Sequence, residues 1–175
     1  ASNGAGATFL LLGRSKLDEE TATWLDWGED KLTARKTELR ETLIAESETG
    51  KITMVEWNNA WSKLTRSMDI YRTIKDIEIS GNHAEYHSAN VTDTEAIGHA
   101  VNGRSITGIV HGAGLEESKL VADKSWSTFD LIVRVKVDGW KALTAAAGES
   151  LRFACSFTSV AGRFGNGGQT DYAAA

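Results

Sequence analysis

Short hydrophobic runs alternate with longer amphipathic stretches along this chain. The run at residues 8–12 is followed by Gly13-Arg14-Ser15, which predicts a buried strand that ends in a loop. Further strands are predicted at 84–91, 106–110 and 151–159, and helices at 94–101 and 125–147. Strands that alternate with helices of this length are joined by right-handed crossovers and form a parallel sheet. The pattern therefore predicts one α/β domain over residues 1–175.

A long polar and helical stretch occupies residues 17–80. Its second half opens with the capping box of Thr53 and Glu56, and Gly81 is in the position of a C-terminal cap. Between them, apolar residues recur at helical spacing: Trp57, Trp61, Leu64, Met68, Tyr71, Ile74 and Ile77. Such a stripe mostly packs within its own domain, and we favour this interpretation over a docking face for a neighbouring domain. The stretch is predicted as a helical insert.

Charge and cysteine content exclude several classes of protein. The formal net charge is −5, which argues against a nucleic-acid-binding surface, and no apolar run approaches the ~20 residues that a membrane helix needs. The single Cys155 excludes an intramolecular disulfide and fits a protein of the reducing cytoplasm. His83, His87 and His99 have no carboxylate or cysteine at ligand spacing, so no metal site is predicted.

Small and polar residues follow four of the predicted strands. Arg14 and Ser15 follow the first strand, Asn90 ends the second, the residues 111–114 end the third, and Ser159 ends the fourth. In an open parallel sheet, ligands bind at the carboxyl ends of the strands. These residues therefore predict one extended cofactor crevice.

Ser159 and Tyr172 are 13 residues apart and are separated by a Gly-rich loop. A serine hydroxyl can hydrogen-bond a carbonyl oxygen while a tyrosine hydroxyl delivers a proton to it. The tyrosine needs a nearby cation that stabilises its phenolate, and Lys136, on an otherwise apolar helix, is a candidate. Each of these residues alone is more often structural. A histidine such as His111, at the end of an apolar strand, is likewise more often structural than catalytic.

Several segments together resemble a known family. They are Gly13-Arg14-Ser15, His111-Gly112-Ala113-Gly114, Lys136-Val137-Asp138-Gly139 and Phe157-Thr158-Ser159-Val160-Ala161-Gly162, followed by Gln169 and Tyr172-Ala173-Ala174-Ala175. In this order they resemble the ketoreductase domains of polyketide and polyunsaturated-fatty-acid synthases, which belong to the short-chain dehydrogenase/reductase superfamily. The resemblance covers nearly the whole chain and implies a Rossmann-like doubly wound parallel sheet.

The resemblance also implies an activity and its partners. The expected reaction is the NADPH-dependent reduction of a β-ketoacyl thioester, bound to an acyl carrier protein, to the β-hydroxyacyl form. Tyr172 would protonate the keto oxygen, and Ser159 would orient it. Lys136 would stabilise the phenolate of Tyr172 and contact the nicotinamide ribose. Neighbouring synthase domains would be further partners, with no nucleic acid and no membrane.

The remaining implied roles concern the cofactor. Arg14 and Ser15 would bind the 2′-phosphate of NADPH through charge-assisted contacts. Asn90 and Val91 would lie beside the adenine, although the family usually has Asp in place of the asparagine. The backbone of the segment His111, Gly112, Ala113 and Gly114 would approach the cofactor closely.

The chain departs from the family pattern at both ends. The Gly-rich phosphate loop that should follow a first strand is absent, and Gly4 and Gly6 precede a strand, which is the wrong context. The asparagine expected four residues after Tyr172 would be one position beyond the last residue. We therefore expect a fragment that lacks its first strand and its last strands and is inactive by itself, with exposed sheet edges and apolar helix faces. A non-catalytic structural subdomain of a synthase, and another short-chain reductase or epimerase, remain alternatives.

Overall fold

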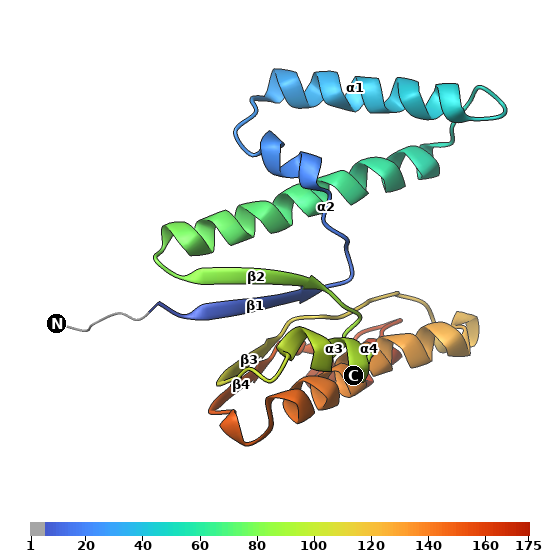
Figure 1. The fold of residues 1–175 in the computed structure, drawn as a ribbon. Coiled ribbons are helices and arrows are strands. Elements are labelled where there is room, and N and C mark those ends of the chain that lie inside the picture. Colours follow the sequence, from blue (N-terminus) through green and yellow to red (C-terminus); the bar gives the residue numbers. More distant parts are fainter. Residues whose placement is uncertain (1–5) are drawn as a thin grey trace. The chain divides into compact units, whose positions relative to one another are not determined.

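Parallel strand pairs form the framework of the protein, whose computed structural model describes residues 6–175 (Figure 1). Strand β1 (Thr8–Gly13) pairs with β2 (His83–Ser88), and β3 (Gly108–His111) pairs with β4 (Phe153–Ser156). The chain divides into two compact units, Ala1–Ser88 (unit 1) and Ala89–Ala175 (unit 2). Parallel strands with intervening helices confirm the predicted α/β class. Gly4 of the segment compared with a phosphate loop lies outside the described residues.

In unit 1, the glycine that ends β1 makes room for a tyrosine on β2. The two strands pair along their whole length. A Cβ atom at Gly13 would lie 2.8 Å from the hydroxyl oxygen of Tyr86. That hydroxyl donates a hydrogen bond of 2.6 Å to the carbonyl of Ser15. The close approach therefore fixes the backbone of the loop that carries Arg14 and Ser15.

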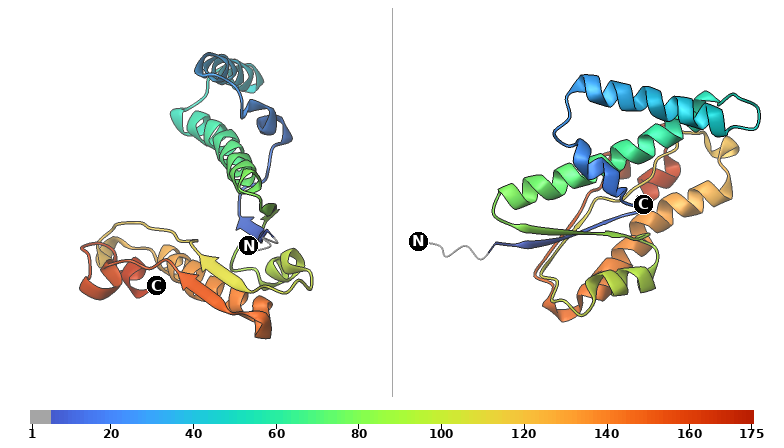
Figure 2. Two further views of the ribbon diagram at one scale, coloured as in Figure 1. Left: turned by 90° about the vertical axis from the view of Figure 1, so that its left-hand side faces the viewer. Right: turned by 45° about the horizontal axis from the view of Figure 1, so that its top comes forward.

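Between β1 and β2, the predicted insert is helical: η1 (Glu19–Trp24) is followed by α1 (Glu29–Glu46) and α2 (Met54–Ile79). Helix α1 packs against α2, and the two run side by side in Figures 1 and 2. The insert is thus a helical layer of its own within unit 1.

Both predicted caps of α2 are confirmed. At its start, the Thr53 hydroxyl accepts a 3.2 Å hydrogen bond from the Glu56 N–H, and the Glu56 carboxylate accepts one of 2.8 Å from the Thr53 N–H. At its end, Gly81 has a φ of +81°, and the N–H groups of Gly81 and Asn82 bond the carbonyls of Glu78 and Ile77. This is the Schellman arrangement, which favours glycine at the left-handed position.

The apolar stripe of α2 packs into the core of unit 1. Trp24, Leu64 and Met68 form the buried cluster, with Leu25, Trp27, Leu32, Leu39 and Trp61 packed against it. The Trp24 ring stacks on those of Trp27 and Trp61, with centroid separations of 5.4 and 6.4 Å. The interpretation of the stripe as a core-packing face is therefore confirmed.

In unit 2, α3 (Thr94–Val101) and β3 both pack against α4 (Trp126–Ala147). Ile97 on α3 and Ile132 on α4 are fully buried. The short helices of the unit are η2 (Val121–Asp123), η3 (Gly148–Ser150), α5 (Ala161–Phe164) and α6 (Thr170–Ala174). Helix α6 packs against both α4 and α5.

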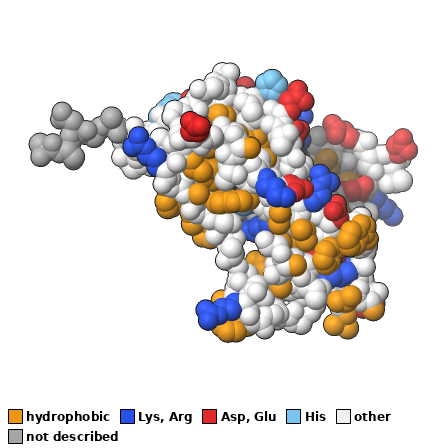
Figure 3. All heavy atoms as spheres, turned by 90° about the horizontal axis from the view of Figure 1, so that it is seen from below, with side chains coloured by type: hydrophobic (Ala, Val, Ile, Leu, Met, Phe, Trp, Pro, Cys, Tyr) orange, Lys and Arg blue, Asp and Glu red, His pale blue; other side chains and the backbone are white. Residues whose placement is uncertain are grey.

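Hydrophobic side chains also reach the surface. On the face drawn in Figure 3 they gather in patches between charged and polar groups. Leu120, Val121 and Trp126 in unit 2 are each more than 60% exposed. These side chains agree with the expectation of exposed apolar surface. Within residues 6–175, no helix is long and apolar enough to cross a membrane.

Candidate active site

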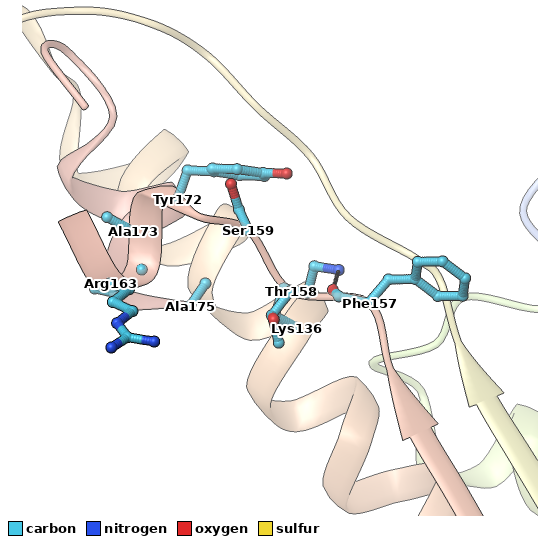
Figure 4. A pocket seen from close by; sticks show the side chains of 10 residues that line it. Lys136, Phe157, Thr158, Ser159, Arg163, Tyr172, Ala173 and Ala175 are labelled. Carbon is cyan, nitrogen blue, oxygen red and sulfur yellow. Dashed lines mark hydrogen bonds between the residues drawn. The ribbon is translucent and has the colours of Figure 1, made fainter. Parts of the chain in front are cut away.

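The three predicted catalytic side chains line one pocket in unit 2. Ser159, Tyr172 and Lys136 surround a cavity of about 360 Å³, as Figure 4 shows from close by. The other lining residues are Phe157, Thr158, Gly162, Arg163, Ala173, Ala174 and Ala175. Residues from α4, from the loop after β4 and from α6 thus converge on one space.

Ser159 lies between the end of β4 and the start of α5. Its hydroxyl oxygen accepts a 3.1 Å hydrogen bond from the Ala161 N–H, and its carbonyl accepts one of 3.1 Å from the Gly162 N–H. A hydroxyl that accepts through its oxygen keeps its own O–H for another acceptor. Ser159 can therefore donate to an oxygen atom bound in the pocket while the turn holds it in place.

Tyr172 lies on α6, which packs closely on α5. A Cβ atom at Gly162 would lie 3.4 Å from the carbonyl oxygen of Ala173, so the missing side chain at this position favours the close approach of the two short helices. The approach brings the Tyr172 ring to the same side of the pocket as Ser159 (Figure 4).

Lys136 extends from α4 towards the loop after β4. Its Nζ atom donates a 2.7 Å hydrogen bond to the carbonyl of Phe157. A Cβ atom at Gly114 would lie 2.9 Å from the Cε atom of Lys136. The absence of a side chain at Gly114 therefore makes room for the lysine stem, a role that the sequence pattern does not reveal.

His111 is buried below this lysine, at the end of β3. Its Nε2 atom lies 3.2 Å from the carbonyl oxygen of Lys136. A neutral imidazole ring with its proton on Nε2 can donate a hydrogen bond to this oxygen. Burial lowers the pKa of His111 below its ordinary value, and the hydrogen bond to that carbonyl offsets this only in part. The structural interpretation of His111 agrees with these contacts, because the ring supports the backbone that carries Lys136.

Helix α4 makes a second close approach at Gly139. A Cβ atom there would lie 2.9 Å from Cγ1 of Val91 and 3.2 Å from Cε1 of His111. Val91 is thus part of the packing beneath the site. The glycine of the segment Lys136-Val137-Asp138-Gly139 lets α4 lie against both side chains.

The other predicted cofactor residues lie in the segments that follow strands β1, β2 and β3. Arg14 is exposed in the loop after β1 and belongs to unit 1 with Ser15. Asn90 follows β2 in unit 2, and its side-chain oxygen accepts a 3.2 Å hydrogen bond from the Thr92 N–H. An amide oxygen has two lone pairs, so this turn leaves one acceptor site. Gly112 and Ala113 are exposed directly after β3, and a Cβ atom at Gly112 would lie 3.9 Å from the Phe157 ring.

Sequence reasoning missed a buried ion pair beside Tyr172. The Nζ atom of Lys124 lies 2.8 Å from the Oδ1 atom of Asp171, and both side chains are almost completely buried. The two residues are 47 positions apart in the sequence, in segments without regular periodicity. Arg163, unlike these two residues, lines the pocket itself, and the sequence pattern assigned it no role.

A serine donor, a tyrosine hydroxyl and a lysine ammonium around one space are suited to proton transfer to a carbonyl oxygen. The model of the KR domain family matches residues 3–175. The chain belongs to this family. Among residues 6–175 of this KR domain, no group of three or more His, Cys, Asp or Glu side chains could hold a metal ion.

The relatives of this KR domain are large synthases. It is 29% identical over 180 residues to a polyunsaturated fatty acid synthase of Thraustochytrium sp., an alignment that spans 98% of this chain and 6% of that protein. It is 34% identical over 108 residues to the polyketide synthase PksM of Bacillus subtilis, spanning 58% of this chain and 2% of the synthase. The chain therefore spans only a small fraction of the length of these relatives.

Solved structures share the fold of this KR domain. An N-terminal ketoreductase from the macrolactin assembly line matches 96% of this chain and 26% of its own, with a TM-score of 0.62 and 21% identity. A 3-oxoacyl-[acyl-carrier protein] reductase of Brucella melitensis, solved with bound NAD, matches 61% of this chain and 46% of its own, with a TM-score of 0.55 and 21% identity. These likenesses confirm the predicted Rossmann-like α/β fold.

Proposed function

We propose that this KR domain reduces the β-keto group of an acyl thioester, carried by an acyl carrier protein, to a β-hydroxyl group with NADPH. The convergence of Ser159, Tyr172 and Lys136 on one pocket carries the proposal. Family membership and the synthase relatives support the thioester substrate and neighbouring synthase domains as partners. We propose further that residues 1–175 belong to one ketoreductase domain of a cytoplasmic synthase, with residues 17–80 as its helical insert.

The residues present fit a nicotinamide cofactor. The pocket offers a lysine ammonium, and the segment 112–114 beside it has glycines whose backbone a ligand can approach. Arg14, with Ser15, would hold the 2′-phosphate, since an exposed guanidinium forms strong bonds to phosphate. Asn90, Val91 and His111 would lie along the remaining length of the cofactor. When bound, the cofactor supplies the hydride.

The side chains of the pocket transfer the proton to the keto oxygen. Ser159 donates its O–H to the keto oxygen and so fixes the carbonyl in the pocket. Tyr172 transfers its phenolic proton to the same oxygen, which completes the alcohol. The ammonium group of Lys136 stabilises the phenolate that remains, because an opposite charge nearby favours the ionised form.

The proposal is tested by NADPH oxidation with a β-ketoacyl thioester, using the full natural polypeptide that contains this sequence. Loss of a positioned general acid slows turnover by about 10²–10⁴-fold, so we expect Tyr172→Phe to be slower by this factor. Tyr71→Phe, on α2 in unit 1, is the matched control and retains normal turnover. NADH is expected to be the poorer donor, and Arg14→Ala to reduce the preference for NADPH.

Two results would contradict the proposal. NADPH binding without turnover of the thioester would indicate another carbonyl substrate, as in other short-chain reductases. Absence of NADPH binding would favour a structural subdomain of the synthase.

A further inference from the structure

Asp171 directly precedes Tyr172 in the sequence and forms a buried ion pair with Lys124, which has no part in the proton transfer described above. The Nζ atom of Lys124 is 2.8 Å from Oδ1 and 2.9 Å from Oδ2 of Asp171. The side chains are 4% and 0% exposed. The same Nζ atom donates a 2.6 Å hydrogen bond to the carbonyl of Glu117. Lys124 therefore binds both the loop before α4 and the first turn of α6.

The carboxylate of Asp171 is also fixed from within α6. Its Oδ1 atom accepts a 2.9 Å hydrogen bond from the N–H of Tyr172. Burial alone would raise the pKa of Asp171, but the hydrogen bonds from Lys124 and from the Tyr172 backbone, with the charge of Lys124, hold it below its ordinary value. The Asp171 side chain is therefore a carboxylate at neutral pH, and its hydrogen bond acts on the backbone of the catalytic tyrosine.

Weaker contacts join the same two segments. The Lys119 N–H donates a 3.0 Å hydrogen bond to the Gly168 carbonyl. The Gln169 amide donates to Glu116 at 2.8 Å and to Ser118 at 3.2 Å. The side-chain bonds are exposed, and exposed polar contacts contribute little to stability, whereas breaking one partner of a buried pair is costly. The ion pair is accordingly the main link between the segments 112–124 and 168–175.

We propose that the Lys124–Asp171 ion pair positions Tyr172 by joining the segment 112–124 to α6. The inference rests on the proposed function, in which Tyr172 is the proton donor. Lys124 and Asp171 are positioning residues, since they act through the backbone of α6 and not on the reacting atoms. A displacement of about 1 Å in a catalytic group can cost about 10²-fold in rate, so a small shift of α6 has a measurable effect.

Three variants distinguish the effect of the buried ion pair from the effects of neighbouring contacts. Asp171→Asn keeps the shape of the side chain and removes the carboxylate with which the buried Lys124 is paired. Lys124→Met removes the charge and keeps the length of the stem, while Lys124→Arg retains the charge. Lys119→Met is the matched control, because it removes an exposed ion pair with Glu117, also 2.8 Å long, from the same segment.

Hydrogen exchange of the full natural polypeptide, followed by mass spectrometry, tests whether the ion pair links the segments 112–124 and 168–175. In Asp171→Asn and Lys124→Met, we expect amides in residues 112–124 and 168–175 to exchange at least about tenfold faster, because a local link is lost. Peptides from β1, β2 and α2, and the Lys119→Met control, are expected to match the wild type. Unchanged exchange in the two segments, or an equal increase throughout the chain, would overturn the inference.

The reactivity of the Tyr172 hydroxyl tests its positioning without any turnover. Acetylation by N-acetylimidazole is mapped by peptide mass spectrometry, with Tyr71 and Tyr86 as internal references. We expect the rate at Tyr172 alone to change by about threefold or more in the two charge-removing variants, because α6 then samples other positions, and to recover in part in Lys124→Arg. Equal rates at Tyr172 in the wild type and the variants would overturn the positioning role.

Kinetics with the thioester complete the test. We expect Asp171→Asn to lower kcat by about 10–100-fold and to leave KM within about twofold, since the chemistry and not binding is disturbed. An unchanged kcat, or an equal fall in Lys119→Met, would overturn the inference. A wild type without turnover would refute the proposed function, and the acetylation rates would then still decide between a positioned and an unpositioned Tyr172.

Discussion

The two units differ in how their cores are filled. Unit 1 is packed with large rings, and Trp24 at its centre is 1% exposed. Unit 2 has aliphatic side chains such as Ile97 and Ile132, and its helix α4 packs closely on Val91 and His111 at Gly139. Unit 2 also buries the titratable side chains of His111 and Asp171, whereas unit 1 buries the hydroxyls of Thr21 and Ser67.

This difference indicates which kind of substitution destabilises each unit. A core of large rings loses transfer free energy and gains a cavity when a ring is removed. A core in which backbones approach closely has no room for added atoms. The ring core of unit 1 is thus expected to be sensitive to lost volume, and the packing of α4 at Gly139 in unit 2 to added volume.

Removal of the Trp24 ring has the largest expected effect on stability. We expect Trp24→Ala to lower the free energy of unfolding of unit 1 by about 3–5 kcal/mol. Trp126→Ala is the matched control, because this ring is 76% exposed and its loss should cost no more than about 0.5 kcal/mol. The urea dependence of hydrogen exchange in peptides from α2 and α4 measures both changes. Equal losses in the two variants would contradict the comparison.

A single added methyl group at Gly139 has the next largest effect. Gly139→Ala would bring Cβ within 2.9 Å of Val91, and we expect this overpacking to destabilise unit 2 by about 1–3 kcal/mol. Gly98→Ala on α3 is the control, since the space around this glycine is open and helix propensity predicts a gain of about 0.5–1 kcal/mol. Hydrogen exchange in α4 and α3 reports both. A stabilising Gly139→Ala would refute the close-packing argument.

Acidification has the smallest expected effect and acts on unit 2. Burial holds the pKa of His111 below the value of 6.5 that an unfolded chain would have. As the pH falls through 6.5, the histidine of the unfolded state takes up its proton before that of the folded state. The free energy of unfolding therefore decreases between pH 6.5 and the lower pKa of the folded state. Well above pH 6.5, the contribution of His111 does not change with pH. Unfolding measured at about pH 7.5 and about pH 5.5 should show this loss in the wild type and less of it in His111→Gln. Equal losses would contradict the assignment.

Elements with local signals were predictable from the sequence. The helix predicted at 94–101 is observed as Thr94–Val101, because its periodicity and its Asp93 cap are both local. The strand predicted at 84–91 ends at Ser88, since Asn90 turns the chain by bonding the Thr92 N–H. Ser159 likewise leaves the predicted strand, because its hydroxyl holds the start of α5.

The candidate site was predictable only in part. Ser159, Tyr172 and Lys136 could be found because strand ends gather ligand-binding residues and because their pattern resembles a known family. The pairing of Lys124 with Asp171 could not be found, since it joins the loop before α4 to helix α6, and the two segments meet only in the folded unit. The same holds for the contact of Gly114 with Lys136, which requires the three-dimensional path of α4.

The ring stack of unit 1 also has an optical consequence. Trp27, Trp24, Trp61 and Trp57 follow one another with centroid separations of 5.4, 6.4 and 6.3 Å and nearly parallel planes. Intense indole transitions at such separations couple, so we expect the far-ultraviolet circular dichroism of this insert to contain a split band that isolated tryptophans lack. Of the tryptophans in unit 2, Trp126 stacks on a phenylalanine and Trp140 lies beside a histidine. The split band is therefore a spectroscopic label, already present in the chain, for the integrity of unit 1.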